Sequence, residues 1–134
     1  MIVTSIPDPV TELIRLHPKP DGFPLLTRVP DEPPERWATL SIDYQQAASE
    51  ASRYARMEAT VHATFPDGSA DTQGLREGCL AICRAAQRLP LESQSAVSCD
   101  LDSGPTFGPG RSGVQTAVMT FLLTVPTTVG KEED

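Results

Sequence analysis

Prolines crowd one early segment of the chain and restrict what it can fold into. Six of the thirteen prolines lie between Pro18 and Pro34, interleaved with Asp, Glu and Gly. Proline lacks the amide proton that an interior helix or a central strand must donate, so we expect an extended arm here. Within it, the run LLTRV has the composition of a short edge strand. The apolar residues that can anchor this arm are Phe23, Leu25, Leu26 and Val29.

The length of this arm leaves two interpretations open. It is either a surface loop that connects two elements or an arm that binds a partner, because long loops in compact domains are uncommon and often functional.

A short helix is predicted before the arm, from about Pro9 to His17. Asp8 can accept hydrogen bonds from free amides of the first turn, and Pro9 suits the first helical position. Val10, Leu13, Ile14 and His17 then share one face. Because His17 lies at the end of this helix, contact with the last carbonyls and the helix dipole is favoured over a role as a ligand.

Alternation of apolar and polar residues predicts two strands after the arm. RWATLSIDYQ has this period, and QAASEAS then breaks it. RYARMEATVHATF shows it most clearly, with Met57, Ala59, Val61, Ala63 and Phe65 on one face. His62 lies on the opposite face among threonines, so we interpret it as solvated rather than as a catalytic base.

The main amphipathic helix is predicted from Asp71 or Thr72 to about Leu89, and Pro90 is expected to stop it. Its inward face repeats at three- and four-residue spacing. Cys79 and Cys83 lie one turn apart, but with Cys99 they fall short of the four ligands of a closed metal site. We therefore interpret all three cysteines as reduced, core-packing thiols in a cytoplasmic setting.

The C-terminal part is predicted to hold the last two strands, AVSCDL and one with alternation from Thr116 to Val125. A long Gly/Pro hairpin loop joins them and carries Phe107 and Arg111 outward. Asp100 and Asp102 are interpreted as solvated turn formers rather than cation ligands. Residues 131–134 form a charged tail that we expect to be disordered.

The predicted fold is one α+β domain over residues 1–130. It has a mostly antiparallel or mixed sheet of four to five strands, packed by one long amphipathic helix and a short N-terminal helix. The proline-rich arm and the Gly/Pro hairpin loop complete it. A chain of 134 residues has little room for a second domain.

The stretch GPGRSG at Gly108 to Gly113 spells the GxGxxG pattern of nucleotide-binding loops. In dinucleotide sites this pattern joins a strand to a helix, whereas here a strand follows. The segments that accompany a kinase glycine loop are also missing. We interpret the stretch as a hairpin connection, and we predict neither a cofactor nor a metal.

The net charge, the apolar runs and the sequence motifs disfavour several classes of function. A net charge of −7 disfavours binding to nucleic acid and anionic lipid. The longest apolar run, AVMTFLLTV, is about half the roughly 18 residues that cross a bilayer, so no membrane partner is expected. No GxSxG elbow or comparable catalytic constellation is recognisable, so we predict that the protein is not an enzyme.

The order of elements resembles the small tail-terminator proteins of long-tailed bacteriophages, especially those of actinobacterial hosts. The resemblance is carried by IVTSIPDPVTELIR, by MEATVHATF followed by DTQGLREGCLAICRAA, and by VSCDLDSGPTFGPGRSGVQTAVMTFLLTV. It covers most of the chain. The sequence departs from this family at TVPTTV, near which relatives commonly carry an arginine.

The resemblance implies a ring of six subunits in the virion, at the head-proximal end of the tail, assembled in the host cytoplasm. Such a ring caps the tail tube, halts its growth and joins it to the head. The expected partners are the protein itself, the major tail tube protein and the head–tail connector. The candidate interface residues are Leu25, Leu26, Arg28, Trp37, Phe107 and Arg111.

Other functions stay open at this point. A head–tail neck or tail-completion protein would share this layout. A small protein-binding module would differ by not forming closed rings. A small enzyme would require His17, His62 or the cysteines to converge in one pocket.

Overall fold

The computed structural model describes residues 8–110 and 113–127, so Arg111 and the predicted tail at residues 131–134 lie outside the described residues. Its five strands form one mixed sheet in the order β1-β2-β3-β5-β4, with β1 parallel to β2 and the other pairs antiparallel. The elements along the chain are α1 (Pro9–Leu16), η1 (Pro20–Gly22), β1 (Leu25–Leu26), β2 (Arg36–Ser49), β3 (Ser52–Ala63), α2 (Thr72–Glu92), β4 (Ser98–Pro109) and β5 (Gln115–Pro126).

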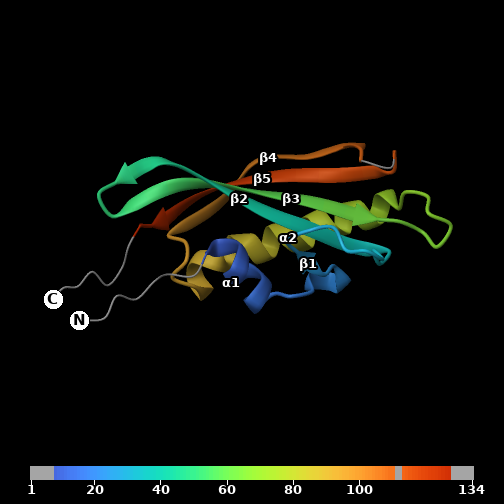
Figure 1. Ribbon diagram of the computed structural model, residues 1–134, viewed down its shortest axis with the longest axis horizontal. Helices are drawn as coiled ribbons and strands as arrows, with labels where there is room; N and C mark the ends of the chain where they lie inside the picture. Colours follow the sequence, from blue (N-terminus) through green and yellow to red (C-terminus); the bar gives the residue numbers. More distant parts are fainter. Residues whose placement is uncertain (1–7, 111–112, 128–134) are drawn as a thin grey trace.

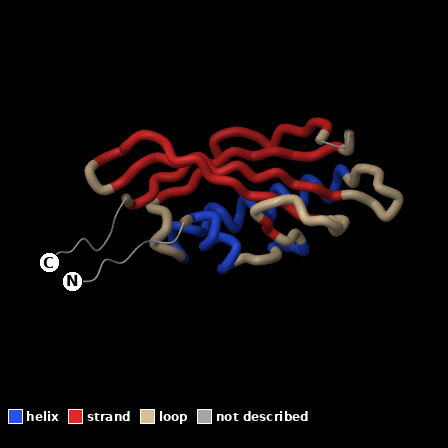
Figure 2. Tube along the Cα trace, in the orientation of Figure 1, coloured by secondary structure: helices blue, strands red, loops and turns tan. Residues whose placement is uncertain are grey.

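Within the described residues, both α-helices lie on one side of the sheet and leave the other side without a helix (Figures 1 and 2). This arrangement confirms the predicted α+β class with a mixed sheet, one long helix and one short N-terminal helix.

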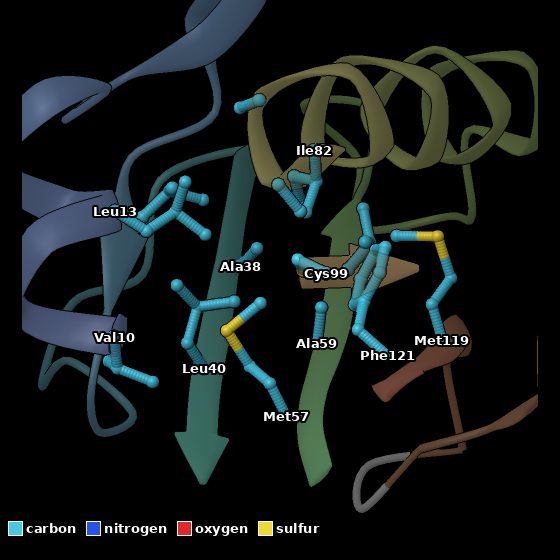
Figure 3. Close-up of a cluster of buried hydrophobic side chains, with 14 of the residues drawn as sticks. Val10, Leu13, Ala38, Leu40, Met57, Ala59, Ile82, Cys99, Met119 and Phe121 are labelled. Carbon is cyan, nitrogen blue, oxygen red and sulfur yellow. The ribbon is translucent and has the colours of Figure 1, made fainter. Parts of the chain in front are cut away.

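The core fills the space between the two helices and the sheet. Alternate residues of β3 face it, and Met57, Ala59, Val61 and Ala63 are fully buried, as their alternation predicted. Leu13 of α1, Ile82 of α2 and Phe121 of β5 point into the same layer (Figure 3). Phe65 was expected to continue the buried face, but it lies beyond the strand and is half exposed.

Helix α1 begins and ends as its sequence predicted, but its histidine has another partner. The Asp8 carboxylate accepts a hydrogen bond from the Thr11 amide at 2.9 Å, and Pro9 follows at the first helical position. The hydrogen bond described for the His17 ring is not to a carbonyl of α1. The ring Nε2 lies 2.6 Å from Glu92 Oε1, because the ends of α1 and α2 meet.

Helix α2 continues past the proline that was expected to stop it. Asp71 accepts a hydrogen bond from the Gly74 amide at 2.9 Å and caps the first turn. At the other end the helix runs two residues beyond Pro90 to Glu92, and the Ser93 amide bonds to the Leu89 carbonyl at 2.9 Å. Pro90 lies within the last turn, where it interrupts few hydrogen bonds, and the burial of Leu89 holds that turn on the core.

The hairpin of β2 and β3 is longer than predicted. QAASEAS was expected to break the strand pattern, yet β2 runs to Ser49 and β3 starts at Ser52. Irregular pairing absorbs the mismatch, and the Arg53 side chain donates two hydrogen bonds to the Gln45 carbonyl, at 2.9 and 3.2 Å. The end of this hairpin projects beyond the helices (Figure 1).

Strand β4 replaces most of the predicted Gly/Pro loop. It extends to Pro109, with register shifts between Leu101 and Thr106, and only residues 110–114 form the connection to β5. Gly104 is required at the irregularity, because its φ is +94° and an added Cβ would lie 2.5 Å from the Val118 carbonyl oxygen. The prediction of a long loop is wrong because β-bulges allow β4 to stay paired with β5 on both sides of the residues that do not fit the regular ladder.

The proline-rich arm is anchored at two of the apolar residues that its sequence offers. Phe23 is fully buried, and Leu25 pairs with Ala38 in the short edge strand β1 that LLTRV predicted. The following segment, residues 27–35, has no regular structure and is called the distal arm below. The arm is thus fixed near β1 and irregular beyond it.

Candidate interaction surfaces

Trp37 and His62 stack on the sheet face that carries no helix. They are register partners on β2 and β3, with ring centroids 3.8 Å apart and an interplanar angle of 3°. Trp37 is buried and His62 is half-buried. The interpretation of His62 as solvated is therefore wrong, because the neighbouring Trp37 ring covers one face of the imidazole.

A pocket of about 390 Å³ lies over this stacked pair and is called the Trp37 pocket. Val29 and Pro33 of the distal arm form one wall, and Gly110 and Val114 of the β4–β5 connection form another. Its remaining lining consists of threonine side chains from three strands, Thr39, Thr60 and Thr116. This combination suits a ligand with an apolar group and a polar atom that can form a hydrogen bond with a threonine hydroxyl.

Burial lowers the pKa of the His62 imidazole below its usual value. Between that usual value and the lowered one, the unfolded chain binds a proton that the folded chain does not, so stability falls as the pH falls. We expect wild-type protein to lose more stability from pH 7.5 to pH 5.5 than a His62→Gln variant. Denaturant unfolding at both pH values measures this difference, and equal losses would contradict it.

A second hollow, the α2–β4 groove, lies between the long helix and the edge strand. Its volume is about 380 Å³. Leu80 and Cys83 line it from α2, and Leu101, Pro105 and Phe107 line it from β4. Leu80 is 52% exposed and Leu101 is 37% exposed, so large apolar side chains here remain open to solvent.

The cysteines pack as predicted from their spacing. Cys79 and Cys99 are buried, Cys83 is partly buried against the core, and all three are free thiols. Burial raises the pKa of Cys79 to about 11 and that of Cys99 to about 12. These thiols therefore stay protonated at neutral pH and react poorly as nucleophiles.

The predicted interface residues do not form one patch. Leu25 and Trp37 are buried within the subunit, Leu26 is half-buried, and Arg28 is exposed. The expected outward projection of Phe107 is wrong, because it lies in β4 opposite Ala117 and packs partly against the core. Of the candidates that the structure describes, Leu26 and Arg28 remain accessible near β1, and the half-buried Phe107 remains accessible in the α2–β4 groove.

The exposed side of α2 was missed by the sequence reasoning. Arg76 lines the α2–β4 groove, and Arg84 follows Leu80 by one helical turn. Neither arginine forms an ion pair with another described residue. The signal was present, because these positions fall outside the apolar face that marked the core of this helix.

Catalysis and metal binding require titratable side chains that lie close together. Across residues 8–110 and 113–127, no three His, Cys, Asp or Glu side chains are placed to hold a metal ion. Asp102, expected to be a solvated turn former, instead pairs with Arg56 from β3. Among the described hydrogen bonds, none joins a histidine to a hydroxyl or a thiol. None of the described helices is long and apolar enough to span a membrane.

The two hollows and the open sheet face are thus suited to binding. A scan of the chain against protein-family models finds no match, and a search of curated proteins finds none either.

Proposed function

We propose that this protein is a virion assembly protein of a long-tailed bacteriophage. In this proposal it forms a ring at the head-proximal end of the tail, caps the tail tube, stops its growth and joins it to the head. The partners are other copies of the chain, the major tail tube protein and the head–tail connector. Leu26, Arg28 and Phe107 remain predicted contact residues, as does Arg111, which lies outside the described residues.

The observation that carries this proposal is the pair of unlike sheet edges. At one edge, β4 has no neighbour among the described strands. At the other edge, β1 pairs only with Ala38 and Thr39 of β2, and no other described strand pairs with the rest of that edge. Strand edges without a neighbour favour pairing with another chain.

Unlike edges on opposite sides support head-to-tail contacts between copies. Such contacts close into a ring when the rotation between subunits permits, and a closed ring has no edge left to extend. A ring of this kind can add once to the end of a tube and then stop further addition. The charge of −7 would also keep it from retaining DNA that passes through it.

Tail-tube growth in the presence of the protein tests this function. Purified major tail tube protein is polymerised with increasing amounts of this chain, and tube lengths are measured by electron microscopy. We expect shorter tubes with added density at one end. Protein added after growth has finished is the matched control and should leave the length distribution unchanged.

Two other results would redirect the assignment. Unchanged tube lengths together with binding to the purified connector would favour a neck or tail-completion protein. A protein-binding module is the second candidate, because the Trp37 pocket can take an apolar side chain of a partner. That candidate is favoured if the chain binds a peptide in this pocket and forms no ring.

A further inference from the structure

We propose that the distal arm of one copy docks in the α2–β4 groove of the next copy. The inference rests on the self-association in the proposed function and does not depend on the tail tube.

The groove offers an apolar floor with positive charge beside it. Leu80, Leu101 and Phe107 provide the apolar surface. Arg76 lines the same groove, and Arg84 lies about two turns farther along the exposed side of α2. A basic, apolar groove on a protein of charge −7 is suited to an acidic segment with apolar residues.

The distal arm has the complementary composition. Asp31 and Glu32 are exposed and form no ion pair with another described residue. Prolines at 30, 33 and 34 restrict this segment to extended conformations, which apolar grooves commonly bind. The arm therefore presents two carboxylates flanked by prolyl rings.

The inner side of the distal arm borders the Trp37 pocket. Val29 and Pro33 line this pocket but are themselves exposed, and Asp31 and Glu32 are exposed as well. The prolines of the arm limit its conformations, which lowers the entropy lost on docking.

The position of the two surfaces requires a second copy. The distal arm lies over the sheet face that the described helices do not cover, where Val29 and Pro33 share the Trp37 pocket with Gly110 and Val114. The groove opens on the other side of the sheet, between α2 and β4. An arm of one copy can therefore fill the groove of its neighbour, whose own arm is free for the next copy, and the contact propagates in one direction.

Charge reversal on each surface tests the contact. We expect Arg76→Glu/Arg84→Glu, and separately Asp31→Lys/Glu32→Lys, to raise the concentration needed for assembly at least about tenfold. Assembly is measured as particle mass in solution and as protein retained on tail tubes. The chain that carries all four substitutions should assemble again, because every arm then meets an oppositely charged groove.

Mixing the two reversed variants separates contact between copies from contact within one chain. In an alternating ring, the native arm of one variant meets the native groove of the other, and both reversed surfaces also meet. We expect the equimolar mixture to assemble although neither variant does so alone, provided that the ring holds an even number of subunits, such as six. Contact within one chain predicts no recovery on mixing.

Arg76→Glu is also made alone, and Lys19→Glu is its matched control, because both remove one exposed positive charge and add one negative charge. The Lys19→Glu variant should assemble as wild type does. If reversing the groove weakens assembly but reversing the arm does not, another acidic segment occupies the groove and the inference is wrong. If the wild type and both charge-reversed variants assemble equally well, only this inference is refuted. If the wild type never assembles, the proposed function is refuted as well.

Discussion

Replacing Phe23 with alanine is expected to lower the free energy of unfolding by about 3–5 kcal/mol. The ring is fully buried and joins the proline-rich arm to the body of the protein. Its edge lies over Gly78 of α2, where an added Cβ would be 2.7 Å from the ring, and the Arg36 guanidinium lies 5.4 Å from the ring centroid. Truncation leaves a cavity that these neighbours cannot close without moving the arm.

Urea denaturation with an unchanged m-value measures this loss. Val29→Ala is the matched control, because Val29 belongs to the same arm but is 53% exposed. We expect it to change stability by less than about 0.5 kcal/mol. A loss below about 1 kcal/mol for Phe23→Ala would show that the arm does not depend on this ring.

Gly78→Val is expected to destabilise the fold by about 3 kcal/mol through overpacking. The new Cβ would lie 2.7 Å from Phe23 and 2.7 Å from Val61, and both of these side chains are fully buried. Alanine at the same position gains about 1 kcal/mol of helix propensity, which offsets part of its own clash. Valine gains less and adds two methyl groups, so its effect is larger.

Chemical denaturation compares this variant with Gln87→Val, which places the same residue at an exposed position of α2. The control isolates the propensity cost of valine, which is below about 1 kcal/mol. In a double-mutant cycle, Phe23→Ala and Gly78→Val should cost less together than the sum of their separate effects, since valine fills part of the space that the ring leaves. Strict additivity would contradict the close contact.

The sequence predicted correctly those elements in which the cap residues or the apolar alternation favour the same structure as the packing of the core. Asp8 and Pro9 mark the start of α1, and the strict alternation from Met57 to Ala63 identifies the buried face of β3. In these segments, the residue that the local rule prefers is also the residue that the core requires.

Tertiary contacts decide the features that the sequence did not predict. His62 belongs to the face expected to be wet, but it stacks on Trp37, and the distal arm reaches this pair from a separate segment of the chain. The projecting hairpin around Ser49 has no apolar alternation, because both of its faces meet solvent. Pairing with β5 carries β4 through residues whose composition is typical of loops.

The candidate surfaces were predictable only in part. The composition of the arm indicated an extended segment with few apolar anchors, and Phe23 and Leu25 are buried accordingly. The α2–β4 groove was not predicted, because it depends on how Leu80 of α2 lies relative to Leu101 of β4. Periodicity within one helix cannot specify which residues of a distant strand lie beside it.

Mass measurement of the purified protein, alone and after incubation with tail tubes, tests the proposed ring most directly. The account predicts a single closed species whose mass is a fixed multiple of the 14.4 kDa chain, six in the proposed ring, in solution or on the tube end. A protein that remains a 14.4 kDa monomer under both conditions would contradict it.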